Sequence, residues 1–211
     1  MGAFMSIERD VVYLGSQSIS RQTLLQEAGI PFVVLSHTST EQEVVYTGDI
    51  EKYVLAIAQG KMQSLVMPEQ TEKPIFVLTA DTMVLLVETG QLFGKPKDIE
   101  DAYAMLAAMY CKPVRVVTGC CLEKRVYQDG CWQVSLAEHF VVGAEVQFNV
   151  HAEDRAEYFK RLPQALYSCG AGIVEDFGAN FVESVRGSYS TITGLPLYEL
   201  RHYLKKLNFI F

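Results

Sequence analysis

The residues with the clearest chemical potential lie near the middle of the chain. Asp81 follows the apolar run at residues 75–79, and Lys95 stands between a glycine and a proline just before a helix-like segment. We predict that the strand ends just before Asp81, because ligands bind at the carboxyl ends of strands in open α/β sheets. A carboxylate and a nearby lysine are the minimum set for binding a metal-bound phosphate. The alternative is that Asp81 caps a turn.

A second candidate segment, residues 15–21, joins a short strand to a helix and has the sequence Gly-Ser-Gln-Ser-Ile-Ser-Arg. Backbone N–H groups at a helix start bind phosphate well, aided by the helix dipole. Ser16 would contribute a hydroxyl, and Arg21 would add a bidentate charge. The alternative is an ordinary helix start, with Ser18 as the N-cap and Arg21 in solvent. The segment is neither a Walker loop nor a Gly-x-Gly-x-x-Gly turn. It therefore lacks the motifs that would indicate a kinase or a dinucleotide-binding protein.

Three further charged residues are weaker candidates when each is taken alone. Glu41 lies in a polar loop, and Lys61 lies late on a helix whose apolar face includes Ile57 and Leu65. Glu175 stands between two glycine-rich stretches, which allow close approach of a ligand to the backbone. The alternative for Glu41 and Lys61 is a solvated side chain. The alternative for Glu175 is a surface turn.

The remaining pattern predicts an α/β protein. Strands are expected at residues 11–14, 32–35, 75–79, 83–87, 113–126 and 132–150, and helices at residues 19–28, 49–67, 99–109, 153–162 and 197–207. Helices and strands interleave early and two long strand segments follow each other, which indicates a mixed, partly antiparallel sheet flanked by helices. The glycine-punctuated stretch 170–194 is expected to be irregular. No internal repeat or linker divides the chain, so we predict a single domain over residues 1–211.

Composition argues against several classes of protein. The net charge of −7 disfavours a surface for a nucleic-acid polymer but allows a small anionic substrate in a local basic cleft. No apolar run reaches the ~20 residues that span a bilayer, and no signal peptide is evident, so we expect no membrane association. The five cysteines lack Cys-x-x-Cys spacing and are typical of reduced thiols in a cytoplasmic protein. The four histidines are scattered, which disfavours a zinc site.

Taken together, these segments resemble the Maf family of septum-formation-type nucleoside triphosphate pyrophosphatases. The matching positions are residues 14–25, 40–41, 61, 80–82, 94–96, 116–119 and 187–197. They correspond to the family's Leu-Ala-Ser-x-Ser-Pro-Arg-Arg opening, loop Asp-Glu pair, helix lysine, Ala-Asp-Thr, Gly-Lys-Pro, Val-x-Thr-Gly and Gly-Ser-Tyr…Gly-Leu-Pro-Leu motifs. No single motif is decisive, but the ordered set over nearly the whole chain is specific.

Several positions depart from the family pattern. Ser20 replaces the first of two arginines and leaves Arg21 as the one arginine of the pair. Thr40 replaces the aspartate of the loop pair, and Val114 stands where a histidine is often seen. Glu175 aligns with a glutamine that is common in the dTTP/UTP branch. These changes are reminiscent of the branch that prefers 7-methyl-GTP, since a carboxylate accepts hydrogen bonds from a guanine edge, but the surrounding sequence fits that branch only loosely and the base preference stays open.

The resemblance implies hydrolysis of a non-canonical or modified nucleoside triphosphate to a monophosphate and pyrophosphate, by a two-lobed homodimeric protein with a central cleft. The implied catalytic residues are Glu41, Lys61, Asp81 and Lys95, and the implied substrate-binding residues are Ser16, Arg21 and Glu175. Glu41 and Asp81 would bind Mg²⁺ or Mn²⁺, and Asp81 would also orient or deprotonate the attacking water. Lys61, Lys95 and Arg21 would neutralise negative charge on the phosphates.

Two alternatives remain open. An inosine triphosphate pyrophosphatase type of hydrolase would share the reaction class, but the opening segment and the Gly-Leu-Pro-Leu end fit it less well. A nucleotide-binding regulatory protein, with turnover weakened by the changes at Ser20 and Thr40, is of a different class. The presence of all four implied catalytic residues argues against it.

Overall fold

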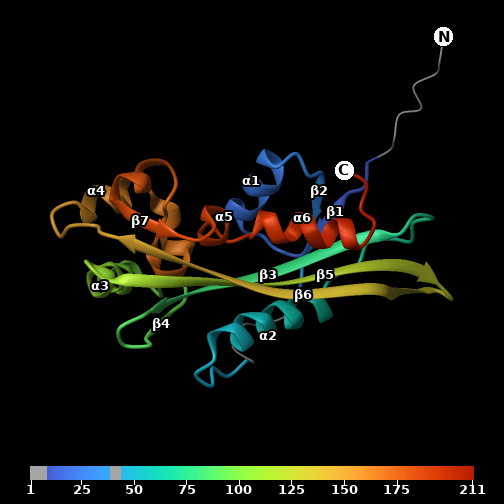
Figure 1. The fold of residues 1–211 in the computed structure, drawn as a ribbon, viewed down its shortest axis with the longest axis horizontal. Coiled ribbons are helices and arrows are strands. Elements are labelled where there is room, and N and C mark those ends of the chain that lie inside the picture. The colour runs from blue at the N-terminus through green and yellow to red at the C-terminus, as the bar shows by residue number, and fades with distance from the viewer. Residues whose placement is uncertain (1–8, 39–43) are drawn as a thin grey trace, which may run out of the picture.

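The computed structural model describes residues 9–38 and 44–211, and its main feature is a long mixed sheet with helices on both faces (Figure 1). Within these ranges, seven strands form one sheet in the order β2-β1-β3-β5-β6-β7, with β4 paired to β3 off this path. The strands are β1 (Val12–Leu14), β2 (Phe32–Val34), β3 (Ile75–Leu86), β4 (Leu92–Phe93), β5 (Pro113–Gln128), β6 (Cys131–Phe148) and β7 (Val182–Arg186). The helices are α1 (Ile19–Glu27), α2 (Ile50–Gln63), α3 (Ile99–Met109), α4 (Arg155–Arg161), α5 (Tyr189–Ile192) and α6 (Leu197–Lys206), with 3₁₀ segments at Pro163–Tyr167, Cys169–Ala171 and Asp176–Phe181.

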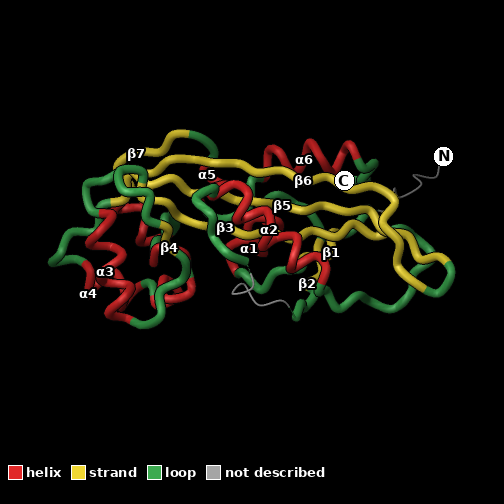
Figure 2. Tube along the Cα trace, turned by 90° about the horizontal axis from the view of Figure 1, so that it is seen from below, coloured by secondary structure: helices red, strands yellow, loops and turns green. Residues whose placement is uncertain are grey.

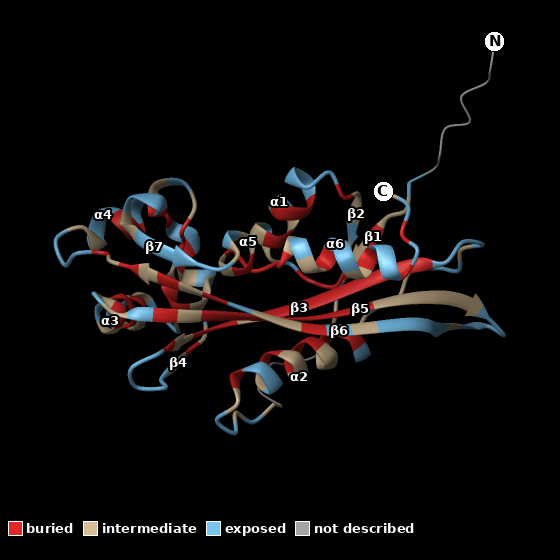
Figure 3. Ribbon diagram, viewed as in Figure 1, coloured by how far each residue is buried: buried red, intermediate tan, exposed pale blue. Residues whose placement is uncertain are grey.

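The sheet confirms the predicted mixed α/β class. Strands β1, β2 and β3 are parallel neighbours, whereas β3, β5, β6 and β7 pair antiparallel. The long strands β3, β5 and β6 run along most of the length of the molecule (Figure 2). β3 is buried over most of its length, whereas much of β6 lies exposed (Figure 3).

One edge of β3 is open in the middle. On this side β1 pairs with β3 only as far as Leu14 opposite Leu78, and β4 pairs only from Val84 onward. Residues 79–83 therefore have no strand partner on this side among the described residues, and we call this segment the open edge of β3. It lies just beyond the carboxyl end of β1, where ligands bind in open sheets.

The prediction that a strand ends before Asp81 is wrong. The two expected strands at 75–79 and 83–87 are one continuous strand, Ile75–Leu86, with Asp81 in its interior. Burying a polar residue inside a strand is costly unless it has a partner, and here Thr79 and Asp81 both have partners on α2.

Two other expectations differ from the structure, one at the end of a helix and one in a stretch that was expected to be irregular. The helix expected over residues 49–67 ends at Gln63, because the Ser64 hydroxyl donates to the Gly60 carbonyl and Leu65 leaves the helix to bridge with His37. The stretch expected to be irregular, 170–194, contains strand β7 and helix α5. The alternation of β7 is hard to recognise because the strand is short and lies largely exposed at the sheet edge.

Helices lie on both sides of the sheet (Figure 1). Successive side chains of β3 point to opposite faces and so reach different helices. Leu78 and Ala80 pack with apolar residues of α1 and α6 on one face, and Val77 and Met83 pack with α2 on the other. Further along the first face, Val84 belongs to a separate hydrophobic cluster with α3 and α4. The two clusters on this face, one with α1 and α6 and the other with α3 and α4, form the two lobes expected from the sequence. The central cleft stays a prediction. None of the helices in the described ranges combines the length and apolar composition needed to cross a bilayer.

Candidate active site

Asp81 and Lys61 form a buried ion pair. The Lys61 Nζ atom lies 2.7 Å from Asp81 Oδ1, and each side chain is 6% exposed. Lys61 lies one turn after Ile57, so both project from the same buried face of α2. The solvated alternative for Lys61 and the turn-capping alternative for Asp81 are therefore wrong. Burying one of these charges alone would be costly, and the opposite charge compensates for it.

Gly119 allows α2 to approach the sheet at the level of this pair. Gly119 lies directly opposite Asp81 on β5. A Cβ atom at this position would come within 2.8 Å of backbone atoms of Val54 and Leu55 in α2. The Thr79 hydroxyl donates to the Ala58 carbonyl at 2.7 Å and adds a second tie between β3 and α2. This close packing brings Lys61 within reach of Asp81.

A Gly119→Ala substitution is expected to lower both stability and the catalytic efficiency proposed below. The added methyl group meets backbone rather than a flexible side chain, so α2 must move away from the sheet and strain of about 1–3 kcal/mol is expected. Urea unfolding of the wild type and the variant measures this change. Gly60→Ala is the matched control, because a Cβ there meets nothing within 4 Å. Equal stability of Gly119→Ala and the wild type would contradict the packing argument.

On the opposite face, Arg21 is held by three different segments. Its Nε donates to the Gly194 carbonyl at 2.9 Å, Nη1 to Ser16 Oγ at 2.8 Å and Nη2 to Thr82 Oγ1 at 3.0 Å. Arg21 is 7% exposed, so the alternative in which it faces solvent is wrong. Ser18 does occupy the N-cap position, but its side chain makes no capping hydrogen bond. Three of the five guanidinium N–H groups are used, and the other two have no acceptor among the described residues.

The open edge of β3 brings the two charged groups together. Asp81 and Thr82 are consecutive, so their side chains point to opposite faces of β3. Asp81 contacts Lys61 below the sheet, and Thr82 contacts Arg21 above it. No described strand pairs with this edge, so the charged groups of both faces meet there without a strand between them.

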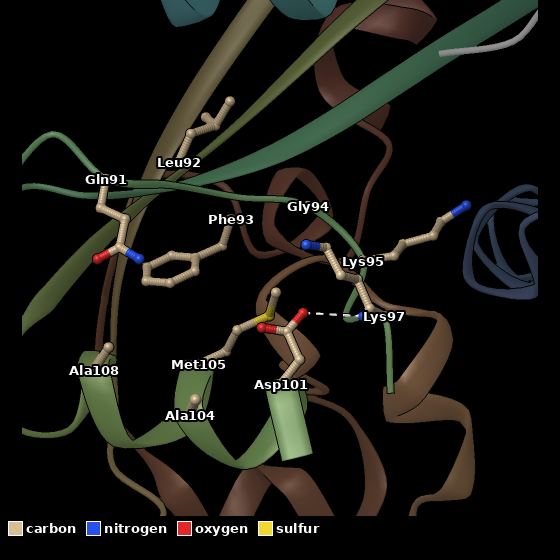
Figure 4. A pocket seen from close by; sticks show the side chains of 10 residues that line it. All are labelled: Gln91, Leu92, Phe93, Gly94, Lys95, Lys97, Asp101, Ala104, Met105 and Ala108. Atoms are coloured by element: carbon tan, nitrogen blue, oxygen red, sulfur yellow. Dashed lines mark hydrogen bonds between the residues drawn. The ribbon is translucent and has the colours of Figure 1, made fainter. Parts of the chain in front are cut away.

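Lys95 lies on a loop that is tied to the same part of β3. The Gly170 N–H donates to the Gly94 carbonyl at 2.9 Å, and the neighbouring Cys169 Sγ donates to the Thr82 carbonyl at 2.9 Å. Lys95 also lines a pocket of about 330 Å³ with Phe93 and Met105. Figure 4 shows the Lys95 and Lys97 side chains extending from the segment after Gly94.

Glu175 lies at the far end of α5 from Arg21. Its Oε2 accepts a hydrogen bond from the Val174 N–H at 3.1 Å, while the Tyr189 hydroxyl donates to the Val174 carbonyl at 3.2 Å. Burial raises the pKa of Glu175, and the nearby acids Asp176 and Glu27 raise it further. Burial and the Glu175 carboxylate also raise the pKa of Tyr189. Glu175 is thus a half-buried acid with no described cation at ion-pair distance.

Only one of the two predicted metal ligands, Asp81, lies within the described residues. Glu41 lies outside the described residues, as does Thr40. Within residues 9–38 and 44–211, no cluster of three or more His, Cys, Asp or Glu side chains is placed to hold a metal ion. A Mg²⁺ ion needs only one or two carboxylates when substrate phosphates complete its oxygen shell. Asp81 at the open edge fits that donor chemistry.

The cysteines agree with the expectation of reduced thiols. All five lie within the described residues and none forms a disulfide, and Cys120 and Cys121 are buried. Burial raises the pKa of Cys121 to about 12 and that of Cys120 further, so neither forms a thiolate near neutral pH.

Sequence reasoning missed the hydroxyls around Arg21. Thr82 Oγ1 lies 2.9 Å from Thr118 Oγ1, and the Thr118 hydroxyl donates to the Thr191 carbonyl at 3.2 Å. All three threonines belong to motifs quoted above. The sequence does not reveal these contacts, because a main-chain carbonyl is present at every residue and its hydrogen-bond partner cannot be predicted from residue type.

These features define an α/β protein with a charged site at the open edge of a mixed sheet, between two lobes. The chain belongs to the Maf-like family: the family model described as "Maf-like protein" matches residues 11–207. A relative from Acholeplasma laidlawii named dTTP/UTP pyrophosphatase is 33% identical over 200 residues, covering 95% of this chain and 98% of the relative. Proteins of the same name from Hydrogenovibrio crunogenus, 32% identical with 94% and 96% coverage, and from Bacteroides fragilis, 32% identical with 96% and 98% coverage, are similar over the same length.

Proposed function

We propose that this protein is a nucleoside triphosphate pyrophosphatase, which hydrolyses the α–β phosphoanhydride bond to give a nucleoside monophosphate and pyrophosphate. The observation that carries the proposal is the buried Lys61–Asp81 pair one residue from the Arg21–Thr82 contact, at the open edge of β3. Family membership and the printed names of the relatives support the same reaction.

In this proposal, Asp81 orients the attacking water or accepts its proton. Lys61 fixes the position of the carboxylate through its 2.7 Å contact and adds a positive charge near the reacting phosphate. Arg21 has two N–H groups left for phosphate oxygens, and Ser16 holds the guanidinium in place beside the start of α1. Lys95 is proposed to neutralise charge on the phosphates from the other lobe.

We further propose that Asp81 and Glu41 hold Mg²⁺ or Mn²⁺. When bound, the metal ion neutralises phosphate charge and acts as a Lewis acid on the phosphoryl group. A single functional domain over residues 1–211, a homodimeric state and a cytoplasmic location remain proposals that follow from the resemblance and the composition.

Glu175 is proposed to contact the base. The relatives named above act, by their names, on thymine and uracil nucleotides. The imide edge of these bases presents an N–H donor flanked by carbonyl acceptors, which a neutral carboxylic acid matches with one donor and one acceptor. An ionised carboxylate instead matches the two adjacent N–H donors of guanine.

The base preference is therefore expected to depend on pH. Because burial raises the pKa of Glu175, its neutral form persists to higher pH than in an exposed glutamate. As the pH rises through this pKa, kcat/KM for GTP and 7-methyl-GTP should rise relative to kcat/KM for dTTP and UTP. Glu175→Gln should remove this pH dependence and shift the preference toward dTTP and UTP by about 10- to 100-fold. An unchanged ranking of the four substrates at each pH would show that Glu175 does not contact the base.

A pyrophosphate-release assay over canonical and modified nucleoside triphosphates, with Mg²⁺ or Mn²⁺, tests the proposed function. We expect release that depends on the divalent cation. Nucleotide binding without any release would favour the regulatory alternative. A marked preference for inosine triphosphate would favour the other pyrophosphatase type.

A further inference from the structure

Helix α5 connects the two ends of the proposed substrate site. At its start, the Tyr189 hydroxyl donates to the Val174 carbonyl, next to Glu175. Just after its end, the Gly194 carbonyl accepts from Arg21 Nε at 2.9 Å. Helix α5 has four residues and rises by only about 6 Å, so these two contacts lie near each other. The Thr191 carbonyl, between these two points, accepts from the Thr118 hydroxyl at 3.2 Å.

The hydrogen bonds around Thr118 have a defined direction. The Thr191 carbonyl is only an acceptor, so the Thr118 hydroxyl donates to it. Thr118 Oγ1 then accepts the proton of Thr82 Oγ1 at 2.9 Å, and Thr82 Oγ1 accepts from Arg21 Nη2 at 3.0 Å. The other arrangement directs the Thr82 proton to the Gly194 carbonyl at 3.5 Å, which is a longer contact than the 3.2 Å one it replaces.

We propose that Thr118 is a positioning residue that locks Arg21 and α5 into one unit and so sets both the affinity for the triphosphate and the discrimination between bases. The proposal rests on the proposed function of this site. Thr118 is fully buried and reaches no ligand itself; it acts through Thr82 and through the Thr191 carbonyl. Thr118 therefore joins a strand of the sheet to both ends of the site.

Removing the Thr118 hydroxyl has a specific consequence. In Thr118→Val, the Thr191 carbonyl loses its donor and the Thr82 proton turns toward the Gly194 carbonyl. Thr82, which accepts from Arg21 Nη2, and the Thr191 carbonyl of α5 both lose their bond to β5, so the guanidinium and α5 are held less firmly. Thr118→Ser keeps the hydroxyl and should restore the network.

Titration calorimetry with the nonhydrolysable α,β-methylene UTP and Mg²⁺, together with steady-state kinetics on UTP and GTP, tests this role. In Thr118→Val we expect Kd and KM to rise about tenfold, kcat to change less than about threefold, and the UTP/GTP preference to weaken. Thr118→Ser should stay within about twofold of the wild type. Ser135→Ala is the control, because it also removes one hydroxyl-to-carbonyl bond to β5, the strand of Thr118, but has no link to Arg21 or to α2.

A double-mutant cycle with Arg21→Lys separates positioning from a general loss of stability. If Thr118 acts through Arg21, Thr118→Val should change Kd less than about twofold in the Arg21→Lys background. Equal effects in both backgrounds, or a rise in Kd for Ser135→Ala as large as that for Thr118→Val, would overturn the proposal. A wild type that binds the analogue but releases no pyrophosphate would reject the proposed function alone, since the Kd comparison still judges Thr118. A wild type that binds no nucleotide would reject both.

Discussion

Asp81→Asn is expected to reduce turnover at least ~10²-fold, which is the usual contribution of a positioned acid or base. The substitution keeps the shape of the side chain and removes its charge, so it tests the chemistry of the carboxylate rather than its packing. Steady-state pyrophosphate release by wild type and variant, at equal concentrations of folded protein, measures the effect. Near-wild-type turnover would mean that Asp81 neither orients the water nor accepts its proton.

The matched control for this variant is Asp129→Asn. Asp129 lies exposed in the turn between β5 and β6, where its positive φ is one that asparagine also adopts. Loss of one carboxylate there should leave turnover within about threefold of the wild type. A comparable loss in both variants would point to a general effect of net charge.

Lys61→Met is expected to destabilise the protein by about 3–5 kcal/mol, because the buried Asp81 carboxylate then lacks the ammonium group that lies 2.7 Å away in the wild type. Methionine keeps most of the apolar length of lysine, so the change isolates the charge. The free energy of unfolding in urea measures the loss. Turnover should also fall, because a positive charge near the phosphates is removed.

Combining the two substitutions separates stability from catalysis. In Lys61→Met/Asp81→Asn neither member of the pair has a charge, so most of the lost free energy of unfolding should return. Turnover should stay as low as in Asp81→Asn. A double variant that is no more stable than Lys61→Met would contradict the ion pair as the source of the destabilisation.

Much of the fold follows from local patterns in the sequence. Helix α3 has the predicted bounds, and β5 and β6 lie within two residues of the predicted ones at each end. Periodicity and capping residues such as Asp98, which accepts from the Asp101 N–H, fix these elements locally. The single strand β3 could not be predicted in this way, because its continuity depends on partners that α2 supplies from elsewhere in the chain.

The candidate site was predicted by residue type but not by geometry. Lys61 and Asp81 were selected separately, and only the structure places them in contact across α2 and β3. The sequence could not decide whether Arg21 is buried or exposed. One of the acceptors that hold it, the Gly194 carbonyl, is a main-chain atom far along the chain. The same reason explains why Thr118 was overlooked. Glu41 lies outside the described residues and stays a prediction.

The central claim is attack of water at the α-phosphorus, and phosphorus NMR of the products formed in ¹⁸O-labelled water tests it most directly. We predict pyrophosphate without label and a nucleoside monophosphate that has one ¹⁸O atom in its phosphate. Orthophosphate with a nucleoside diphosphate, or label in the pyrophosphate, would contradict the account.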